Sequence, residues 1–103
     1  MSAAPLHLGL AGLGTVGIGV VKIIQAHADL ITARAGRPVR ITAVSARDRQ
    51  KNRDADLSGY AWETDPVALA RRPDIDVFVE VMGGHEGPAR DATEAALAAG
   101  KHV

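Results

Sequence analysis

Three glycines near the amino terminus have the spacing of a loop that can hold a diphosphate. The pattern is G-x-G-x-x-G, and it comprises Gly12, Leu13, Gly14, Thr15, Val16 and Gly17. The first glycine would allow a tight turn, the second would let the backbone approach a diphosphate, and the third would let a helix pack closely on a strand. The amides of Leu13 to Val16 and the Thr15 hydroxyl are the expected donors, because a helix start carries unpaired N–H groups and partial positive charge. A turn used only for packing is the alternative.

A second candidate contact with a dinucleotide lies in a charged segment that begins at Arg47. At this place NAD-preferring sites carry an acidic residue for the ribose 2′-hydroxyl, whereas an arginine accommodates the 2′-phosphate of NADP. Arg47 comes first, with Lys51 close behind, and a planar guanidinium suits a phosphate. We therefore expect NADP as the cofactor. Asp48 would serve NAD if the loop turned the other way, and a solvated charged loop is the alternative for Lys51.

A third candidate contact is formed by Gly83 and Gly84, which follow an apolar stretch ending at Met82. Without side chains there, the ribose or nicotinamide of the cofactor could lie against the backbone. A plain glycine turn is the alternative. Glu80 interrupts the apolar stretch, and we expect it to be a structural, hydrogen-bonded carboxylate rather than a catalytic base. The four histidines lack the spacing of metal ligands, so no metal site is expected.

The elements that must position these residues begin with an apolar strand from Leu6 to Ala11. Apolar residues then recur every three or four positions and predict a single helix of about five turns. Its predicted buried face consists of Val16, Val20, Ile24, Ala28, Ile31 and Ala35. Gly36 and Pro38 give a stop signal. The alternation from Val39 to Ala46 predicts a second strand.

The second half of the chain repeats the alternation of strand and helix. We expect a short strand from Tyr60 to Glu63, and then a helix that Asp65 caps and Pro66 begins. A buried strand is predicted from Ile75 to Met82. A helix should start at Pro88 and turn its alanines to the sheet, namely Ala89, Ala92, Ala96 and Ala99.

This order predicts an α/β fold of the Rossmann type, a doubly wound parallel sheet with helices on both faces. Lys101 to Val103 resemble the opening of a fifth strand, at which the sequence stops. A natural domain rarely ends there, because the edge of the sheet would be left unpaired. We therefore expect residues 1–103 to be one NAD(P)-binding domain, the amino-terminal fragment of a longer protein.

Composition excludes several classes of function. The 103 residues carry no formal net charge, so no basic field would draw the chain to nucleic acid or to an anionic membrane. There is no cysteine, which excludes a disulfide framework, a thiolate metal site and a cysteine nucleophile. The sequence has neither a signal-peptide pattern nor an apolar run of about 20 residues. The cytoplasm is the expected location.

Several motifs, in order along the whole chain, resemble those of homoserine dehydrogenases. The resemblance covers residues 9–17 with 19–21, 44–48, 64–66, 79–84 with 88–89, and 98–103. It implies reversible hydride transfer between NAD(P)H and L-aspartate 4-semialdehyde, giving L-homoserine. By the same resemblance, the amides of Leu13 to Val16 would hold the pyrophosphate. Arg47 and Lys51 would hold the 2′-phosphate, and Gly83 and Gly84 would border the nicotinamide ribose.

The resemblance also implies that the catalytic domain lies beyond Val103, so no catalytic residue is assigned within the chain. Members of the family are usually homodimers formed through that further region. Three other readings stay open on sequence alone. They are a related amino-acid or semialdehyde dehydrogenase, a non-catalytic dinucleotide-sensing module, and a similar fold that binds no dinucleotide.

Overall fold

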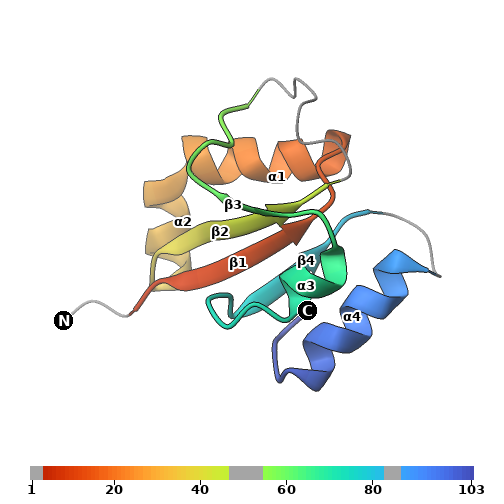
Figure 1. The fold of residues 1–103 in the computed structure, drawn as a ribbon. Coiled ribbons are helices and arrows are strands. Elements are labelled where there is room, and N and C mark those ends of the chain that lie inside the picture. The colour runs from red at the N-terminus through yellow and green to blue at the C-terminus, as the bar shows by residue number, and fades with distance from the viewer. Residues whose placement is uncertain (1–3, 47–54, 83–86) are drawn as a thin grey trace.

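The computed structural model describes residues 4–46, 55–82 and 87–103. The predicted contacts Arg47, Lys51, Gly83 and Gly84 lie outside these residues. The elements, in chain order, are β1 (Leu6–Ala11), α1 (Thr15–Ala26), α2 (Ala28–Ala35), β2 (Val39–Ser45), β3 (Ala61–Glu63), α3 (Pro66–Ala70), β4 (Val77–Glu80) and α4 (Pro88–Ala98) (Figure 1).

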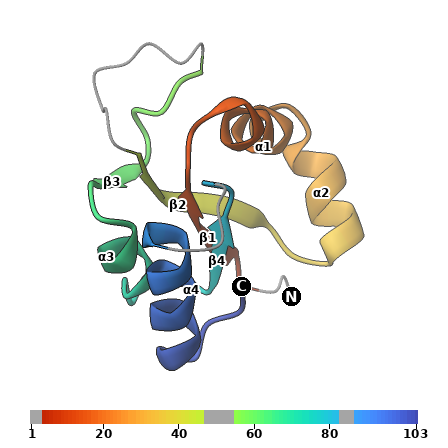
Figure 2. The ribbon, with the colours of Figure 1, turned by 90° about the vertical axis from the view of Figure 1, so that its right-hand side faces the viewer.

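The described strands form one parallel sheet in the order β3-β2-β1-β4. Helices α1 and α2 cover one face of this sheet, and α3 and α4 cover the other (Figure 2). His102 forms a single parallel bridge with Val77, which already pairs with Leu8 of β1 on its other side. The predicted Rossmann-type architecture is confirmed, and the bridge agrees with a fifth strand starting beside β4.

Two apolar cores lie on the opposite faces of the sheet, because successive strand residues point to opposite sides. Towards α1, Leu10 and Val44 pack with Val21, which is fully buried. On the face towards α3 and α4, the sheet contributes two alanines and a phenylalanine, and they pack against buried residues of the helices and loops. This second core contains Ala11, Ala43, Phe78, Leu69, Ala70, Ile75, Ala92 and Ala96.

The prediction of a single long helix after the glycine pattern was wrong, because the structure has two helices there. Helices α1 and α2 meet at His27, whose φ of −123° and ψ of 30° are not helical, and their axes differ by 85°. A straight helix of 20 residues would be about 30 Å long. The six residues of β1 extend only about 20 Å. The bend therefore keeps the chain beside the sheet and returns it to the start of β2.

The predicted buried face of this helix was right only in part. Val20 and Ile24 pack against the core under α1, as predicted, but the other positions differ. Val16 is 64% exposed, and the buried residues of α1 are Gly17 and Val21. None of the residues of α2 is buried. Of the helices that the structure describes, none could span a bilayer alone by length and composition. The pair α1 and α2 passes that test together, but only across its sharp bend.

The remaining boundaries follow the prediction with small differences. Asp65 caps α3 by accepting a hydrogen bond from the Val67 amide at 2.9 Å, and Pro66 is the first helical residue, as predicted. Strand β4 is shorter than the predicted range Ile75 to Met82. In α4 the predicted alanines are buried except Ala99, which lies exposed at the end of the helix.

Candidate dinucleotide site

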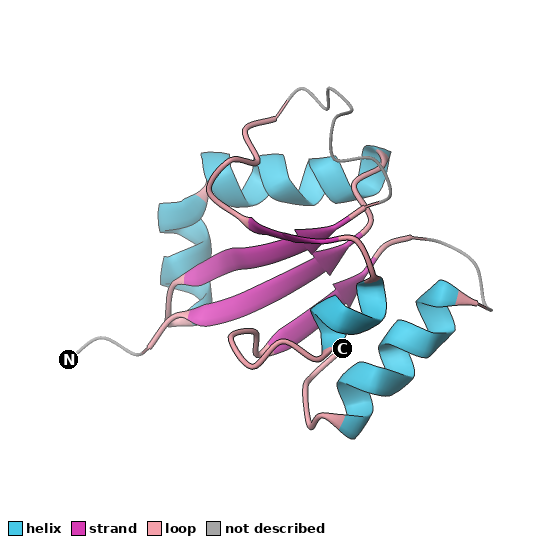
Figure 3. Cartoon of the chain, viewed as in Figure 1, coloured by secondary structure: helices cyan, strands magenta, loops and turns pink. Residues whose placement is uncertain are grey.

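The glycine turn lies at the carboxyl end of β1, between the ends of β2 and β4. Ala11 pairs with Ser45 on one side and with Glu80 on the other. From β1 the chain enters α1 on one face of the sheet, whereas from β4 it leads to α4 on the other face (Figure 3). Adjacent strands whose connections leave on opposite faces open a crevice at their carboxyl ends, where ligands bind in open α/β sheets.

Gly12 is required by the approach of β4. Its φ is +103°, a conformation that other residues rarely adopt. A Cβ at Gly12 would lie 2.9 Å from the Val81 carbonyl oxygen and 3.0 Å from the Met82 nitrogen. The Gly12 amide donates to the Ser45 carbonyl oxygen at 2.9 Å, which ties the turn to β2. The predicted turn role of Gly12 is confirmed.

Gly17 is required by the packing of α1 on the same turn. A Cβ there would lie 1.9 Å from the carbonyl oxygen of Gly12, closer than any real contact. The helix therefore rests directly on the backbone of the turn, and the predicted packing role of Gly17 is confirmed. Together Gly12 and Gly17 fix the direction in which α1 starts.

Gly14 differs from the other two glycines. Its φ of −74° is open to any residue, and no described atom lies within 4 Å of a Cβ built there. It is the N-cap of α1, where no side chain makes a capping hydrogen bond and the first turn contains no acidic residue. Thr15 and Val16 beside it are exposed, whereas the Leu13 side chain is buried in the core under α1. No contact among the described residues therefore requires a glycine at this position.

Glu80 lies at the carboxyl end of β4, where it pairs with Ala11, the residue before the glycine turn. Its Oε1 accepts a hydrogen bond from the Met82 amide at 2.6 Å, in agreement with the expected structural carboxylate. The Val81 amide, between them, donates to the Ala11 carbonyl oxygen at 2.9 Å. The structure therefore brings together Gly12, Ser45 and the segment from Glu80 to Met82.

Gln25 is a structural residue that the sequence patterns did not reveal. Its Nε2 donates to the Asp56 carbonyl oxygen and to the Tyr60 hydroxyl, both at 2.9 Å. These bonds hold the segment before β3 against α1. A glutamine on an exposed helix position has no distinctive pattern, so only the tertiary structure reveals this contact.

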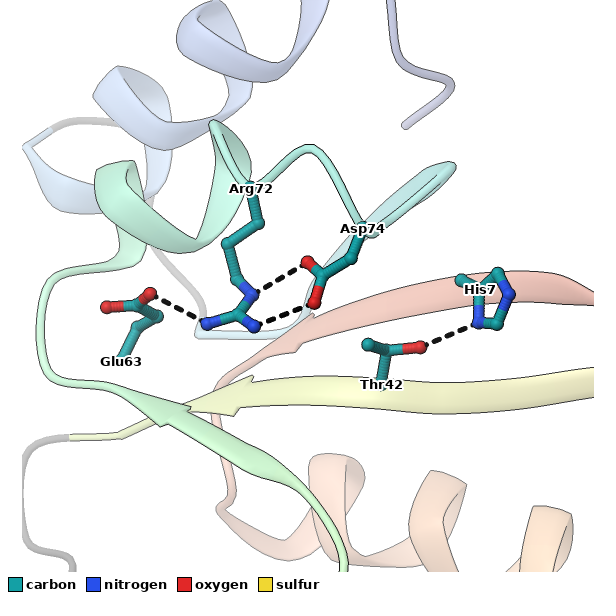
Figure 4. Close-up of polar contacts among 5 residues, drawn as sticks. All are labelled: His7, Thr42, Glu63, Arg72 and Asp74. Atoms are coloured by element: carbon teal, nitrogen blue, oxygen red, sulfur yellow. Dashed lines mark hydrogen bonds and ion pairs between the residues drawn. The ribbon is translucent and has the colours of Figure 1, made fainter.

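The polar contacts in Figure 4 are structural links elsewhere on the sheet. Arg72 binds both carboxylate oxygens of Asp74, at 2.8 and 2.7 Å, and Glu63 at 3.0 Å. The hydrogen bonds from Arg72 hold the pKa of Asp74 below its usual value. His7 Nδ1 lies 2.9 Å from the Thr42 hydroxyl. No group of three potential metal-ligating side chains occurs among the residues that the structure describes.

The strand order, the switch point between β1 and β4, and the glycine turn beside it define the class of Rossmann-type α/β domains. Within that class, the model of one family, "Homoserine dehydrogenase, NAD binding domain", matches residues 12–103. The chain belongs to this family of homoserine dehydrogenase NAD-binding domains.

Individual relatives agree with the family assignment. Homoserine dehydrogenase from Bacillus subtilis (strain 168) is 43% identical over 98 residues, which are 95% of this chain and 22% of that protein. The enzyme from Neisseria gonorrhoeae is 40% identical over 99 residues, 96% of this chain and 22% of the relative. The chain therefore spans less than a quarter of the length of these curated relatives.

Solved structures of homoserine dehydrogenases contain the same fold. The structure from Thiobacillus denitrificans superimposes with a TM-score of 0.86 at 40% identity, over 99% of this chain and 23% of that one. A structure of the S. aureus enzyme at pH 7.5 gives a TM-score of 0.84 at 37% identity, over 96% of this chain and 24% of that one.

Proposed function

We propose that residues 1–103 bind NAD(P) as the amino-terminal, cofactor-binding domain of a homoserine dehydrogenase. The catalytic and dimerisation domain would lie in a further part of the polypeptide, and the whole enzyme would act as a homodimer in the cytoplasm. Membership of the family supports this assignment, and the relatives are more than four times as long as the matched region.

The observation that carries the proposal is the contrast among the three glycines. Gly12 and Gly17 are required by contacts within the chain, but a Cβ at Gly14 would have no neighbour within 4 Å among the residues that the structure describes. A glycine that the fold does not need can serve a partner that approaches the backbone closely, and the second glycine of this pattern does so for a pyrophosphate. A Cβ at Gly14 would then stand in the path of the ligand.

The start of α1 offers the donors for such a diphosphate. The N-cap position has no side-chain cap, and no acidic residue in the first turn competes for the helix amides. Unpaired amides and the positive end of the helix dipole favour an anion at this place. We assign the pyrophosphate to the amides of Leu13, Gly14, Thr15 and Val16 and to the Thr15 hydroxyl.

We further propose a preference for NADP over NAD. The proposal rests on the sequence alone, because Arg47 and Lys51 follow the end of β2, where the 2′-substituent of the adenosine ribose is recognised. Asp48 is the residue that would favour NAD instead. Gly83 and Gly84, which follow β4, would border the nicotinamide ribose.

In the proposed reaction, bound NADPH would supply the hydride for the aldehyde carbon of L-aspartate 4-semialdehyde, whose carbonyl oxygen would gain a proton to give L-homoserine. The role of the present chain is to bind and orient the cofactor. Its glycine turn and helix start hold the diphosphate, and the ends of β2 and β4 flank the two halves of the dinucleotide. We assign no catalytic residue and no metal ligand within these residues.

Calorimetric titration of this chain with NADPH and with NADH, side by side at low salt, tests the proposal. Tighter binding of NADPH would support both the cofactor site and the role of Arg47. Equal binding, or tighter binding of NADH, would keep the site and overturn the role of Arg47 in favour of Asp48. Binding of neither dinucleotide would contradict the proposed function of the chain.

A further inference from the structure

We infer that Glu80 is a positioning residue for the nicotinamide half of the dinucleotide, acting through the peptide group between Val81 and Met82. The inference rests on the proposed cofactor-binding function and extends it to a residue outside the glycine pattern. Glu80 is the last residue of β4, in a strand whose other residues are Val77, Phe78 and Val79. A carboxylate at the end of an otherwise apolar strand needs a specific reason.

The structure shows hydrogen bonds from two consecutive amides, one to a backbone oxygen and one to the Glu80 side chain. The Val81 amide donates to the Ala11 carbonyl oxygen, at 2.9 Å, which continues the pairing of β4 with β1. The next amide, that of Met82, donates to Oε1 of Glu80 at 2.6 Å. Past the end of the strand, the Glu80 carboxylate thus replaces a backbone carbonyl oxygen as the hydrogen-bond acceptor. Hydrogen bonds to a carboxylate are shorter and stronger than those between neutral groups, so Glu80 fixes the peptide firmly.

The glycine turn packs against the same peptide group, between Val81 and Met82, that Glu80 holds. A Cβ at Gly12 would lie 2.9 Å from the Val81 carbonyl oxygen and 3.0 Å from the Met82 nitrogen. These atoms belong to one peptide group, so its position sets how closely β4 approaches the turn. A small movement of this peptide would change how the end of β4 fits against the glycine turn.

The location of the crevice indicates which half of the cofactor Glu80 affects. A dinucleotide crosses the sheet at the switch point, and its adenosine ribose meets the end of the second strand. Strand β2 lies on one side of β1 and β4 on the other. The adenosine half would therefore lie towards β2, and the nicotinamide half would lie over the end of β4, where Glu80 acts.

The test compares Glu80→Met, which keeps the length of the side chain but removes the acceptor, with Glu80→Gln, whose amide oxygen can still accept. Each variant of the present chain is titrated with NADPH and with 2′,5′-ADP, which lacks the nicotinamide half. We expect Glu80→Met to raise the Kd for NADPH about tenfold, as loss of one charged hydrogen bond would do, and to change the Kd for 2′,5′-ADP less than about twofold. Glu80→Gln should keep the NADPH Kd within about threefold of the parent value.

Asp65 offers a matched control. Its carboxylate also accepts a hydrogen bond from the amide two residues ahead, that of Val67, at 2.9 Å. Asp65 follows β3, however, and β3 is the edge strand farthest from β4. Asp65→Leu should lower the midpoint of thermal unfolding and leave the NADPH Kd within about twofold, because a capping bond contributes to stability alone.

A second variant serves if Glu80→Met does not fold. Glu80→Asp withdraws the acceptor by one methylene and should raise the NADPH Kd about threefold, with unchanged 2′,5′-ADP binding.

The outcomes separate this inference from the proposed function. If the parent chain binds neither NADPH nor 2′,5′-ADP, the proposed function fails and the inference fails with it. If the parent binds both, the inference is overturned by an unchanged NADPH affinity in Glu80→Met, or by an equal loss for the two ligands. A Glu80→Gln variant as weak as Glu80→Met would overturn the role of the hydrogen bond acceptor.

Discussion

The two edges of the parallel sheet use their polar groups in different ways. At the amino edge, where the parallel strands begin, the polar groups near His7 bind one another. The His7 amide donates to the Asp76 carboxylate, and the His7 carbonyl oxygen accepts from the Asp76 amide. The His7 ring lies within hydrogen-bond distance of the Thr42 hydroxyl. At the carboxyl edge, where the strands end, the start of α1 has no side-chain cap. A Cβ at Gly14 would have no described neighbour within 4 Å.

In a fold of this kind, binding capacity lies where backbone groups have no partner within the protein. Backbone groups that the protein satisfies internally contribute to stability, whereas groups at an uncapped helix start are available to an anion. The glycine pattern contains both kinds of position. Gly12 and Gly17 serve the fold, and Gly14 is the position whose substitution should affect ligand binding more than stability.

The largest expected effect is on stability, from Gly17→Ala. The added Cβ would lie 1.9 Å from the Gly12 carbonyl oxygen, so the helix must move away from the turn. We expect the free energy of unfolding to fall by about 3 kcal/mol. Urea denaturation followed by circular dichroism measures it. Gly19→Ala on the same helix is the control, because its Cβ would have no described neighbour within 4 Å, and it should stabilise by about 1 kcal/mol. Equal effects of the two changes would contradict the packing role of Gly17.

The next effect is on affinity, from Gly14→Val. The backbone there is ordinary and the space is open, so the free energy of unfolding should fall by no more than about 1 kcal/mol. The Kd for NADPH should rise roughly thirtyfold, or about 2 kcal/mol, because the side chain would occupy the diphosphate position. Calorimetry and urea denaturation of the same sample give both numbers. Unchanged affinity would remove the distinction between the two edges.

A smaller effect is expected from Thr42→Val at the amino edge. The change removes the hydroxyl beside His7 while keeping a β-branched side chain suited to a strand. The free energy of unfolding should fall by about 1 kcal/mol, the contribution of one hydrogen bond. The Kd for NADPH should not change. A loss of affinity without a loss of stability would show that the amino edge also contributes to binding.

The smallest effect concerns Asp74 and pH. Hydrogen bonds from Arg72 lower the pKa of Asp74 from its ordinary value of 3.8, so the ionised form is stabilised in the folded state. This contribution is present above that value and is lost as pH falls through the lower, folded pKa. Asp74 is 45% exposed, so the contribution is below about 1 kcal/mol. The stability difference between the parent and Asp74→Asn should therefore shrink in acid, as denaturation series at pH 7 and pH 3 would measure. A difference that grows in acid would contradict this assignment.

Much of the fold follows from local sequence patterns. The strand from Leu6 to Ala11 was predicted with its observed bounds, and the cap formed by Asp65 and Pro66 was predicted from their types alone. The roles of Gly12 and Gly17 also follow from spacing, since each glycine answers a steric demand that recurs in this kind of turn.

Other features were not predictable, because they depend on distances between elements. Nothing in the sequence around His27 predicts a bend of 85°, which arises where the helix would overrun the sheet. The exposure of Val16 has the same origin, since the bend and the contact of Gly17 with the turn set which side of α1 faces the core.

Residue types at short spacing were therefore enough to predict the strands, the glycine turn and the resemblance to a family, but not the division of the first helix into α1 and α2. The fold was needed to show that Gly12 and Gly17 are closely packed while Gly14 has no described neighbour, and that Glu80 holds the peptide beside Gly12. These contacts between β1, β4 and α1 join residues far apart in sequence, where spacing carries no information.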